Sequence, residues 1–141
     1  MDCRLFLDTA RFLHSQGRNE ADYRSAVSRA YYACFIEFSE VLFNVCECDW
    51  RAKGRRSQRQ IRHAEVRDCL RGSSVLDLRN LGNDFGSLQT KRSNADYDMD
   101  SSFGEEDAED AILLADGLLS DMSAVDPADI RQTARRFMSS L

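Results

Sequence analysis

The sequence predicts an all-α fold, an up-and-down helical bundle of about five to six helices that forms one domain over residues 1–141. Apolar residues recur at spacings of three and four in nearly every segment, which is the period of an α-helix. The chain has one proline and seven glycines, so little interrupts long helices. With 43% hydrophobic and 30% charged residues, the composition is that of a soluble globular protein able to bury a core.

The N-terminal part of the chain supplies two helices. Apolar side chains over residues 5–13 line one side of a first helix, which Gly17 can end. Asn19 offers an N-cap for a longer second helix that runs to about residue 45. The apolar stripe of this second helix is broad, so we expect it at the centre of the bundle.

Four more helices follow a polar, basic loop over residues 47–57. We expect them over residues 58–70, from Ser73 or Ser74 to about Asp96, over residues 105–122 and over residues 127–139. Gly82 and Gly86 lie inside the second of these four and indicate a kink or close packing against another helix. Asp126 followed by Pro127 is an N-cap with proline in the first turn, which opens the last helix.

Charge is strongly segregated along the chain. Residues 51–71 contain eight basic and two acidic side chains, whereas residues 96–110 contain eight acidic side chains and no basic one. A polyanion could bind the first segment and would be repelled by the second. Alternatively, both segments are solvated surface and pair with each other. If the basic segment binds RNA, the candidate contacts are Arg55, Arg56, Arg59 and Arg62.

The five cysteines are an odd number without a regular framework. The N-terminus lacks a signal peptide, and no apolar run approaches the roughly 20 residues that span a bilayer. We therefore expect a cytoplasmic protein without membrane contact, in which several cysteines are reduced core residues. Cys46 and Cys48 could be joined by His63 around a metal, but paired Cys-x-x-Cys spacing is missing, so we expect neither metal nor cofactor.

The candidate functional residues are Arg92, Asp96, Tyr97 and His63. The first three share one side of a helix, where Arg92 and Asp96 can pair. Such a group can also be a surface salt bridge beside a packing tyrosine. RNA cleavage by 2′-hydroxyl attack needs a cation, which Arg92 supplies, and a group that moves protons, for which Tyr97, Asp96 or His63 is available. A plain surface histidine is the simpler interpretation of His63.

A family resemblance rests on two motifs in this order. The run from Tyr23 to Phe35, which contains Ser-Arg-Ala-Tyr-Tyr-Ala, resembles the long second helix of HEPN-domain proteins, small α-helical proteins of prokaryotic toxin–antitoxin and defence systems. The later Arg92-x-x-Ala95-Asp96-Tyr97 is similar to the second signature of the branch with this helix. His63 also matches a position where such proteins often carry histidine. The similarity covers about residues 5–122, so the last helix is additional to it.

The resemblance implies a homodimer that places both copies of the arginine motif at a shared cleft. Ribonuclease members carry a histidine a few residues after the arginine, whereas no histidine follows Arg92 here and Tyr97 stands in its place. This branch also often has histidine at the position of Ile36. The first hypothesis is an RNA-directed HEPN component of a toxin–antitoxin or antiphage module, either a metal-independent endoribonuclease that uses Arg92 with His63 or a non-cleaving RNA binder.

The second hypothesis makes the protein a non-catalytic partner of a nucleotidyltransferase or of a larger defence effector. Some HEPN toxins are silenced when such a partner adenylylates a motif tyrosine, so the resemblance makes Tyr97 the candidate acceptor. A third possibility is a structural adaptor whose basic loop binds another protein.

Overall fold

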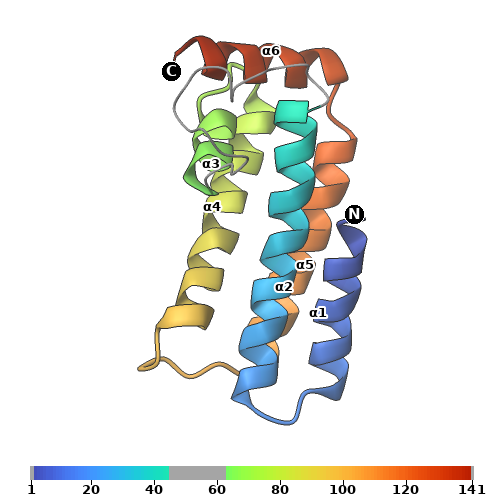
Figure 1. The fold of residues 1–141 in the computed structure, drawn as a ribbon, viewed down its shortest axis with the longest axis vertical. Helices are drawn as coiled ribbons and strands as arrows, with labels where there is room; N and C mark the ends of the chain where they lie inside the picture. The colour runs from blue at the N-terminus through green and yellow to red at the C-terminus, as the bar shows by residue number, and fades with distance from the viewer. Residues whose placement is uncertain (1, 45–62, 141) are drawn as a thin grey trace.

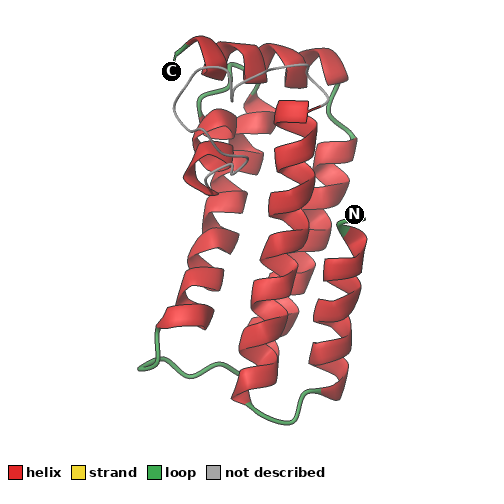
Figure 2. Cartoon of the chain, viewed as in Figure 1, coloured by secondary structure: helices red, strands yellow, loops and turns green. Residues whose placement is uncertain are grey.

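The fold was obtained as a computed structural model, in which residues 2–44 and 63–140 are described. These residues form helices joined by turns and contain no strand, which confirms the predicted all-α class (Figure 2). In chain order the elements are α1 (Arg4–Gln16), α2 (Glu20–Ser39), the short π-helix η1 (Glu40–Asn44), α3 (His63–Arg71), α4 (Leu76–Tyr97), α5 (Glu105–Ser123) and α6 (Pro127–Ser139).

The four long helices α1, α2, α4 and α5 run alternately down and up beside one another (Figure 1). The short helix α3 packs against the first half of α4, and α6 lies across the end of the bundle where α4 begins. The turn between α4 and α5 lies at the opposite end. Among the described residues, no helix is both long enough and apolar enough to cross a bilayer.

Helix α2 occupies the centre of the bundle, as its broad apolar stripe predicted. It packs against α1, α4 and α5, and it also contacts α3. Its side chains Tyr31, Cys34 and Phe38 are fully buried. Because α2 touches every other long helix, its residues can meet side chains from distant parts of the sequence.

The capping residues in the sequence predicted several helix ends correctly. Gly17 follows the last residue of α1, the Asn19 side chain accepts a hydrogen bond from the backbone N–H of Asp22, and the Asp126 side chain accepts one from Ala128. The expected cap at Ser73 or Ser74 was wrong, because α4 begins at Leu76 with Val75 as its N-cap residue.

Instead of capping α4, the Ser73 hydroxyl bonds to a residue of α6. It lies 2.7 Å from the hydroxyl of Thr133 in α6 and accepts a 3.0 Å hydrogen bond from the backbone N–H of Val75. Both serine and threonine are buried. This polar pair therefore helps to fix α6 across the end of the bundle.

The two glycines inside α4 mark a close helix contact. A Cβ atom on Gly82 would lie 2.7 Å from the backbone nitrogen of Arg71 and 2.9 Å from the Cβ of Leu70. A Cβ on Gly86 would collide with the guanidinium of Arg71. Helix α4 is continuous past both glycines, so they allow the approach of α3, which carries His63 as its first residue.

Several expectations fall partly or wholly outside the described residues. They are the loop over residues 47–57, the expected start of the third helix at Gln58, the candidate RNA contacts Arg55, Arg56, Arg59 and Arg62, and the cysteines Cys46 and Cys48. The remaining cysteines, Cys3, Cys34 and Cys69, are buried, which confirms them as core residues. Burial raises the pKa of the Cys3 thiol to about 11, so this side chain is a neutral thiol at physiological pH.

Candidate functional site

Arg92 projects from the last third of α4 toward α2. Its Nε atom lies 2.9 Å from Oδ2 of Asp96, which confirms the pairing expected for residues four apart. The Nε–H is not directed at the carboxylate, so this contact is a charge pair rather than an aligned hydrogen bond. Arg92 Nη2 donates a 2.9 Å hydrogen bond to the hydroxyl of Tyr32. Two helices therefore fix the direction of this guanidinium.

His63 is the first residue of α3, and it contacts Tyr31, the residue that precedes Tyr32 on α2. Its Nδ1 atom lies 2.7 Å from the hydroxyl of Tyr31, and its ring stacks on Phe35 with 4.1 Å between centroids. The interpretation of His63 as a plain surface histidine was therefore wrong. The sequence could not show this contact, because Tyr31 is 32 residues away.

Burial determines the protonation of this histidine–tyrosine pair. Desolvation, and secondarily the positive charge of Arg92, lower the pKa of His63 below its ordinary value of 6.5. Burial raises the pKa of the Tyr31 phenol well above its ordinary value of 10. At neutral pH the hydroxyl of Tyr31 therefore keeps its proton. We assign this hydroxyl as the donor to Nδ1, because its proton would otherwise have no acceptor among the described residues. The imidazole is neutral and carries its own proton on Nε2.

A second arginine lies beside Tyr32. The guanidinium carbon of Arg92 lies 5.5 Å from the ring centroid of Tyr31 and 5.3 Å from that of Tyr32. The guanidinium carbon of Arg29 lies 5.7 Å from the ring centroid of Tyr32. Sequence reasoning missed Arg29, although its spacing of three from Tyr32 on a helix places both on one face. Two cations thus flank one partly exposed phenol.

Tyr97 lies at the rim of this arrangement. It is the last residue of α4, its side chain is 73% exposed, and its ring centroid is 5.9 Å from the guanidinium carbon of Arg92. The structure therefore brings Arg92, Asp96 and His63 together around the two tyrosines, and leaves the hydroxyl-bearing ring of Tyr97 facing solvent. We call Tyr31, Tyr32, His63, Arg92 and Asp96 the arginine–histidine cluster.

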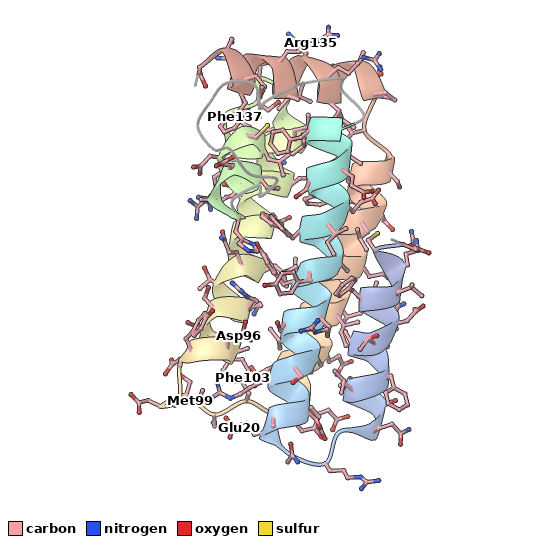
Figure 3. All side chains as sticks on the ribbon, in the orientation of Figure 1. Glu20, Asp96, Met99, Phe103, Arg135 and Phe137 are labelled. Atoms are coloured by element: carbon pink, nitrogen blue, oxygen red, sulfur yellow. The ribbon has the colours of Figure 1, made fainter. Side chains whose placement is uncertain are left out.

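Arg24 on α2 holds the end of α4 that bears the cluster. Its Nη1 donates hydrogen bonds to the backbone oxygens of Asn94 at 3.1 Å and Ala95 at 2.8 Å, which are carbonyls of the last helical turn. Its Nη2 pairs with Glu20 at 2.9 Å, and its guanidinium carbon lies 4.5 Å from the centroid of the Phe103 ring. Glu20, Phe103 and Asp96 accordingly lie at the same end of the bundle (Figure 3).

Within residues 2–44 and 63–140, no group of three or more histidine, cysteine or acidic side chains is arranged to hold a metal ion. Cys46 and Cys48, the two cysteines that could bind a metal together with His63, lie outside these ranges. The chemistry of the cluster is that of a guanidinium and a neutral imidazole N–H, two donors suited to an anion.

Comparisons of the chain with protein-family models, with curated proteins and with solved structures find no match.

Proposed function

We propose that this protein is a HEPN-type component of a toxin–antitoxin or antiphage module, and that it binds or acts on RNA at the arginine–histidine cluster. One observation carries the proposal. Two adjacent tyrosines of α2 hold a guanidinium from the end of α4 and an imidazole from the start of α3. The hydroxyl of Tyr32 accepts from Arg92, and the hydroxyl of Tyr31 bonds to His63. This arrangement gives a role to the one histidine that the motif resemblance singled out, although it lies far from Arg92 in sequence.

A phosphate group suits the donors of the cluster. Arg92 donates from Nη2 to Tyr32 and forms a charge pair with Asp96, and its Nη1 has no hydrogen-bond partner within the described part of the chain. The Nε2–H of His63 has no hydrogen-bond acceptor there either. A guanidinium N–H and an imidazole N–H can each donate to a phosphate oxygen. Arg29 adds a further positive charge beside Tyr32 and would strengthen the attraction.

The proton on Nε2 favours RNA binding over cleavage. Cleavage requires a base that removes the proton of the 2′-hydroxyl, so that this oxygen attacks phosphorus and the 5′-oxygen leaves with a 2′,3′-cyclic phosphate behind. His63 could act as that base at Nε2 only if Nδ1 carried the proton. The buried hydroxyl of Tyr31 would then lose its acceptor, at a cost of about 1–3 kcal/mol. A metal-independent endoribonuclease is accordingly the less favoured form of the proposal.

Fluorescence anisotropy with single-stranded RNA tests the proposal directly. Arg92→Ala and His63→Ala should each weaken binding, whereas Arg4→Ala should not, since Arg4 is an exposed arginine at the start of α1 and outside the cluster. Equal affinities for all three variants and the wild type would reject the cluster as the RNA site. The same samples, incubated with labelled RNA, test for products that end in a 2′,3′-cyclic phosphate.

The proposal includes a homodimer, because the HEPN resemblance implies that two copies of the arginine motif share a cleft. Light scattering should therefore give twice the mass of the 16.1 kDa chain. A monomer that still binds RNA through Arg92 would remove the shared cleft from the proposal and leave the RNA site in place.

The exposure of Tyr97 favours a second candidate function. A phenol that is 73% exposed at the end of α4 is accessible to a modifying enzyme, unlike the partly buried Tyr32 or the fully buried Tyr31. A partner nucleotidyltransferase would transfer AMP from ATP to the Tyr97 oxygen and release pyrophosphate. Mass spectrometry after incubation with a genomically adjacent nucleotidyltransferase should show one added AMP. Tyr97→Phe should abolish the addition, and Tyr32→Phe should not.

A further inference from the structure

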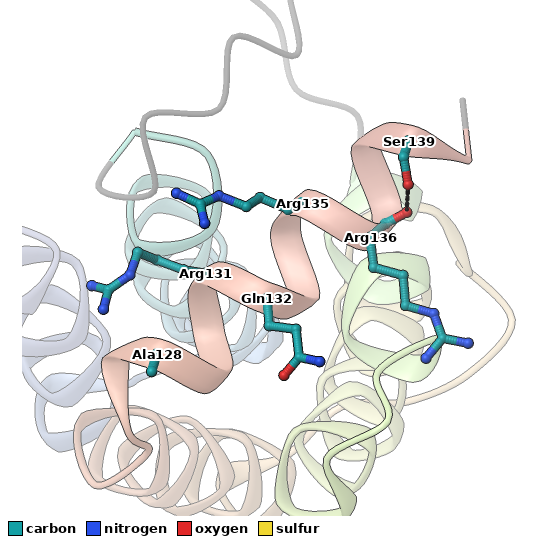
Figure 4. Close-up of a pocket in the computed structure, with 6 residues that line it drawn as sticks. All are labelled: Ala128, Arg131, Gln132, Arg135, Arg136 and Ser139. Atoms are coloured by element: carbon teal, nitrogen blue, oxygen red, sulfur yellow. Dashed lines mark hydrogen bonds between the residues drawn. The ribbon is translucent and has the colours of Figure 1, made fainter.

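The outward face of α6 carries three exposed arginines. Arg131, Arg135 and Arg136 surround an open pocket of about 780 Å³ together with Gln132 and two small residues of the same helix (Figure 4). Within residues 2–44 and 63–140, no carboxylate lies within ion-pair distance of these three guanidinium groups. This helix also lies beyond the part of the chain that resembles HEPN proteins.

The opposite face of α6 fixes these arginines in position. Ile130, Ala134 and Met138 are buried against the bundle, and Thr133 bonds to Ser73. An α-helix rises about 1.5 Å per residue, so Arg131 and Arg135 stand about 6 Å apart along its axis on one side. Arg131 and Arg135 are therefore held in one row on a packed helix rather than on a flexible tail, whereas Arg136 points to the other side (Figure 4).

The composition of this face distinguishes between possible ligands. Protein interfaces are organised around buried aromatic or aliphatic side chains. None of the large exposed hydrophobic side chains of the described residues lies on α6. Arginines flanked by glutamine, serine and alanine instead match the phosphate contacts of nucleic-acid-binding surfaces. A polyphosphate backbone therefore fits this face better than a protein partner does.

We propose that the outer face of α6 binds the phosphate backbone of the same RNA strand that reaches the arginine–histidine cluster, an inference that rests on the proposed function. The side chain of Arg136 extends toward α3 (Figure 4) and lines a second pocket of about 330 Å³ with Asp68 and Gly72. The charge of Asp68 is offset by Arg67 at 3.1 Å. Helix α3 thus connects the α6 arginines to His63 at its own first residue.

The charge at the two ends of the bundle gives the strand a direction. The first turns of α5, at the end away from α6, carry five exposed acidic side chains: Glu105, Glu106, Asp107, Glu109 and Asp110. These carboxylates repel phosphate, so a strand bound at Arg92 extends toward α6 rather than past α5. The start of α4, which lies near α6, is about 24 Å from Arg92 along the helix axis. Only an RNA of several nucleotides can contact both places.

A pair of charge-matched variants tests this inference by fluorescence anisotropy. Arg131→Gln/Arg135→Gln removes two exposed charges from α6, and Arg4→Gln/Arg18→Gln removes two exposed charges near α1. For single strands each phosphate contact contributes about 0.7 to the slope of log K against log salt. Two lost contacts should therefore flatten the slope by about 1.4 and weaken binding of an RNA of about 16 nucleotides roughly 25-fold at 0.1 M salt. The α1 variant should bind like the wild type.

The outcomes separate this inference from the proposed function. Weaker binding for Arg92→Ala with unchanged binding for the α6 variant would overturn the inference alone. Weaker binding for the α6 variant with no effect of Arg92→Ala would support the α6 site and reject the cluster. Absence of RNA binding by the wild type would reject both. Equal losses in the α6 and α1 variants would show a general charge effect and overturn the inference. Loss of self-association in the α6 variant without loss of RNA affinity would assign this face to a protein contact instead.

Discussion

Replacing Gly82 with alanine tests whether close packing of α3 on α4 positions His63. The new Cβ would lie 2.7 Å from the backbone nitrogen of Arg71 and 2.9 Å from the Cβ of Leu70, neither of which can move without a shift of α3. Overpacking of this kind costs about 1–3 kcal/mol. Alanine is favoured over glycine inside a helix by about 1 kcal/mol. Gly82→Ala should therefore lower the free energy of unfolding by roughly 0–2 kcal/mol.

Gly117 provides the matched control, because it also lies inside a helix but its Cβ would meet nothing within 4 Å. Gly117→Ala should raise the free energy of unfolding by about 1 kcal/mol. The difference between the two variants isolates the packing cost, since both gain the same helix propensity. Urea denaturation followed by circular dichroism gives both values. Equal stabilisation of the two variants would refute the close approach of α3 to α4.

The same displacement should reach the site. If α3 moves, the hydrogen bond between Tyr31 and Nδ1 of His63 lengthens, and the pKa of His63 should shift in a proton NMR titration of Gly82→Ala. Gly117→Ala should leave the His63 titration unchanged, which separates a local effect on α3 from a general change in stability.

Four further predictions concern the cluster and its support. His63 should titrate below 6.5 by NMR, and Tyr31→Phe should raise that pKa, because the lost hydrogen bond favoured the neutral ring; no change would contradict the assigned donor. Since the unfolded chain binds this proton at higher pH than the folded one, the free energy of unfolding should fall as pH drops below 6.5 and level off once the folded histidine is protonated. Arg24→Ala should lower the free energy of unfolding by about 2–3 kcal/mol and speed hydrogen exchange at the end of α4, because charged hydrogen bonds to carbonyls are lost. Faster exchange only in other helices would contradict this role of Arg24. Asp96→Asn should strengthen RNA binding about threefold at low salt, as expected for one negative charge removed roughly 6 Å from a phosphate, whereas weaker binding would show that the carboxylate chiefly orients Arg92.

The features that the sequence predicted correctly depend on neighbours in the chain. The caps at Asn19 and Asp126 are local hydrogen bonds, and the pairing of Arg92 with Asp96 follows from helical spacing alone. The broad apolar stripe of α2 likewise predicted its central position. In each case the interacting groups are separated by one helical turn or belong to a single helix face.

The features that the sequence did not predict depend on distant contacts. The hydroxyl of Ser73 meets Thr133, which is 60 residues away, so a residue with good capping chemistry serves another purpose. Arg24 reaches carbonyls 70 and 71 residues away. His63 meets Tyr31, which is 32 residues away, only because α3 packs beside α2. Helical periodicity identifies buried faces, but it does not determine which polar side chains meet across them.

The pKa of His63 with and without bound RNA tests the central claim most directly, because it reports on the cluster rather than on overall affinity. A phosphate that accepts a hydrogen bond from Nε2 places negative charge beside the ring and stabilises the imidazolium. Saturating single-stranded RNA should therefore raise the pKa of His63 in an NMR titration. His14, the other histidine of the chain, lies on α1 beside Glu105 and serves as the internal reference. A His63 titration that is unchanged while RNA is bound would contradict phosphate binding at this site.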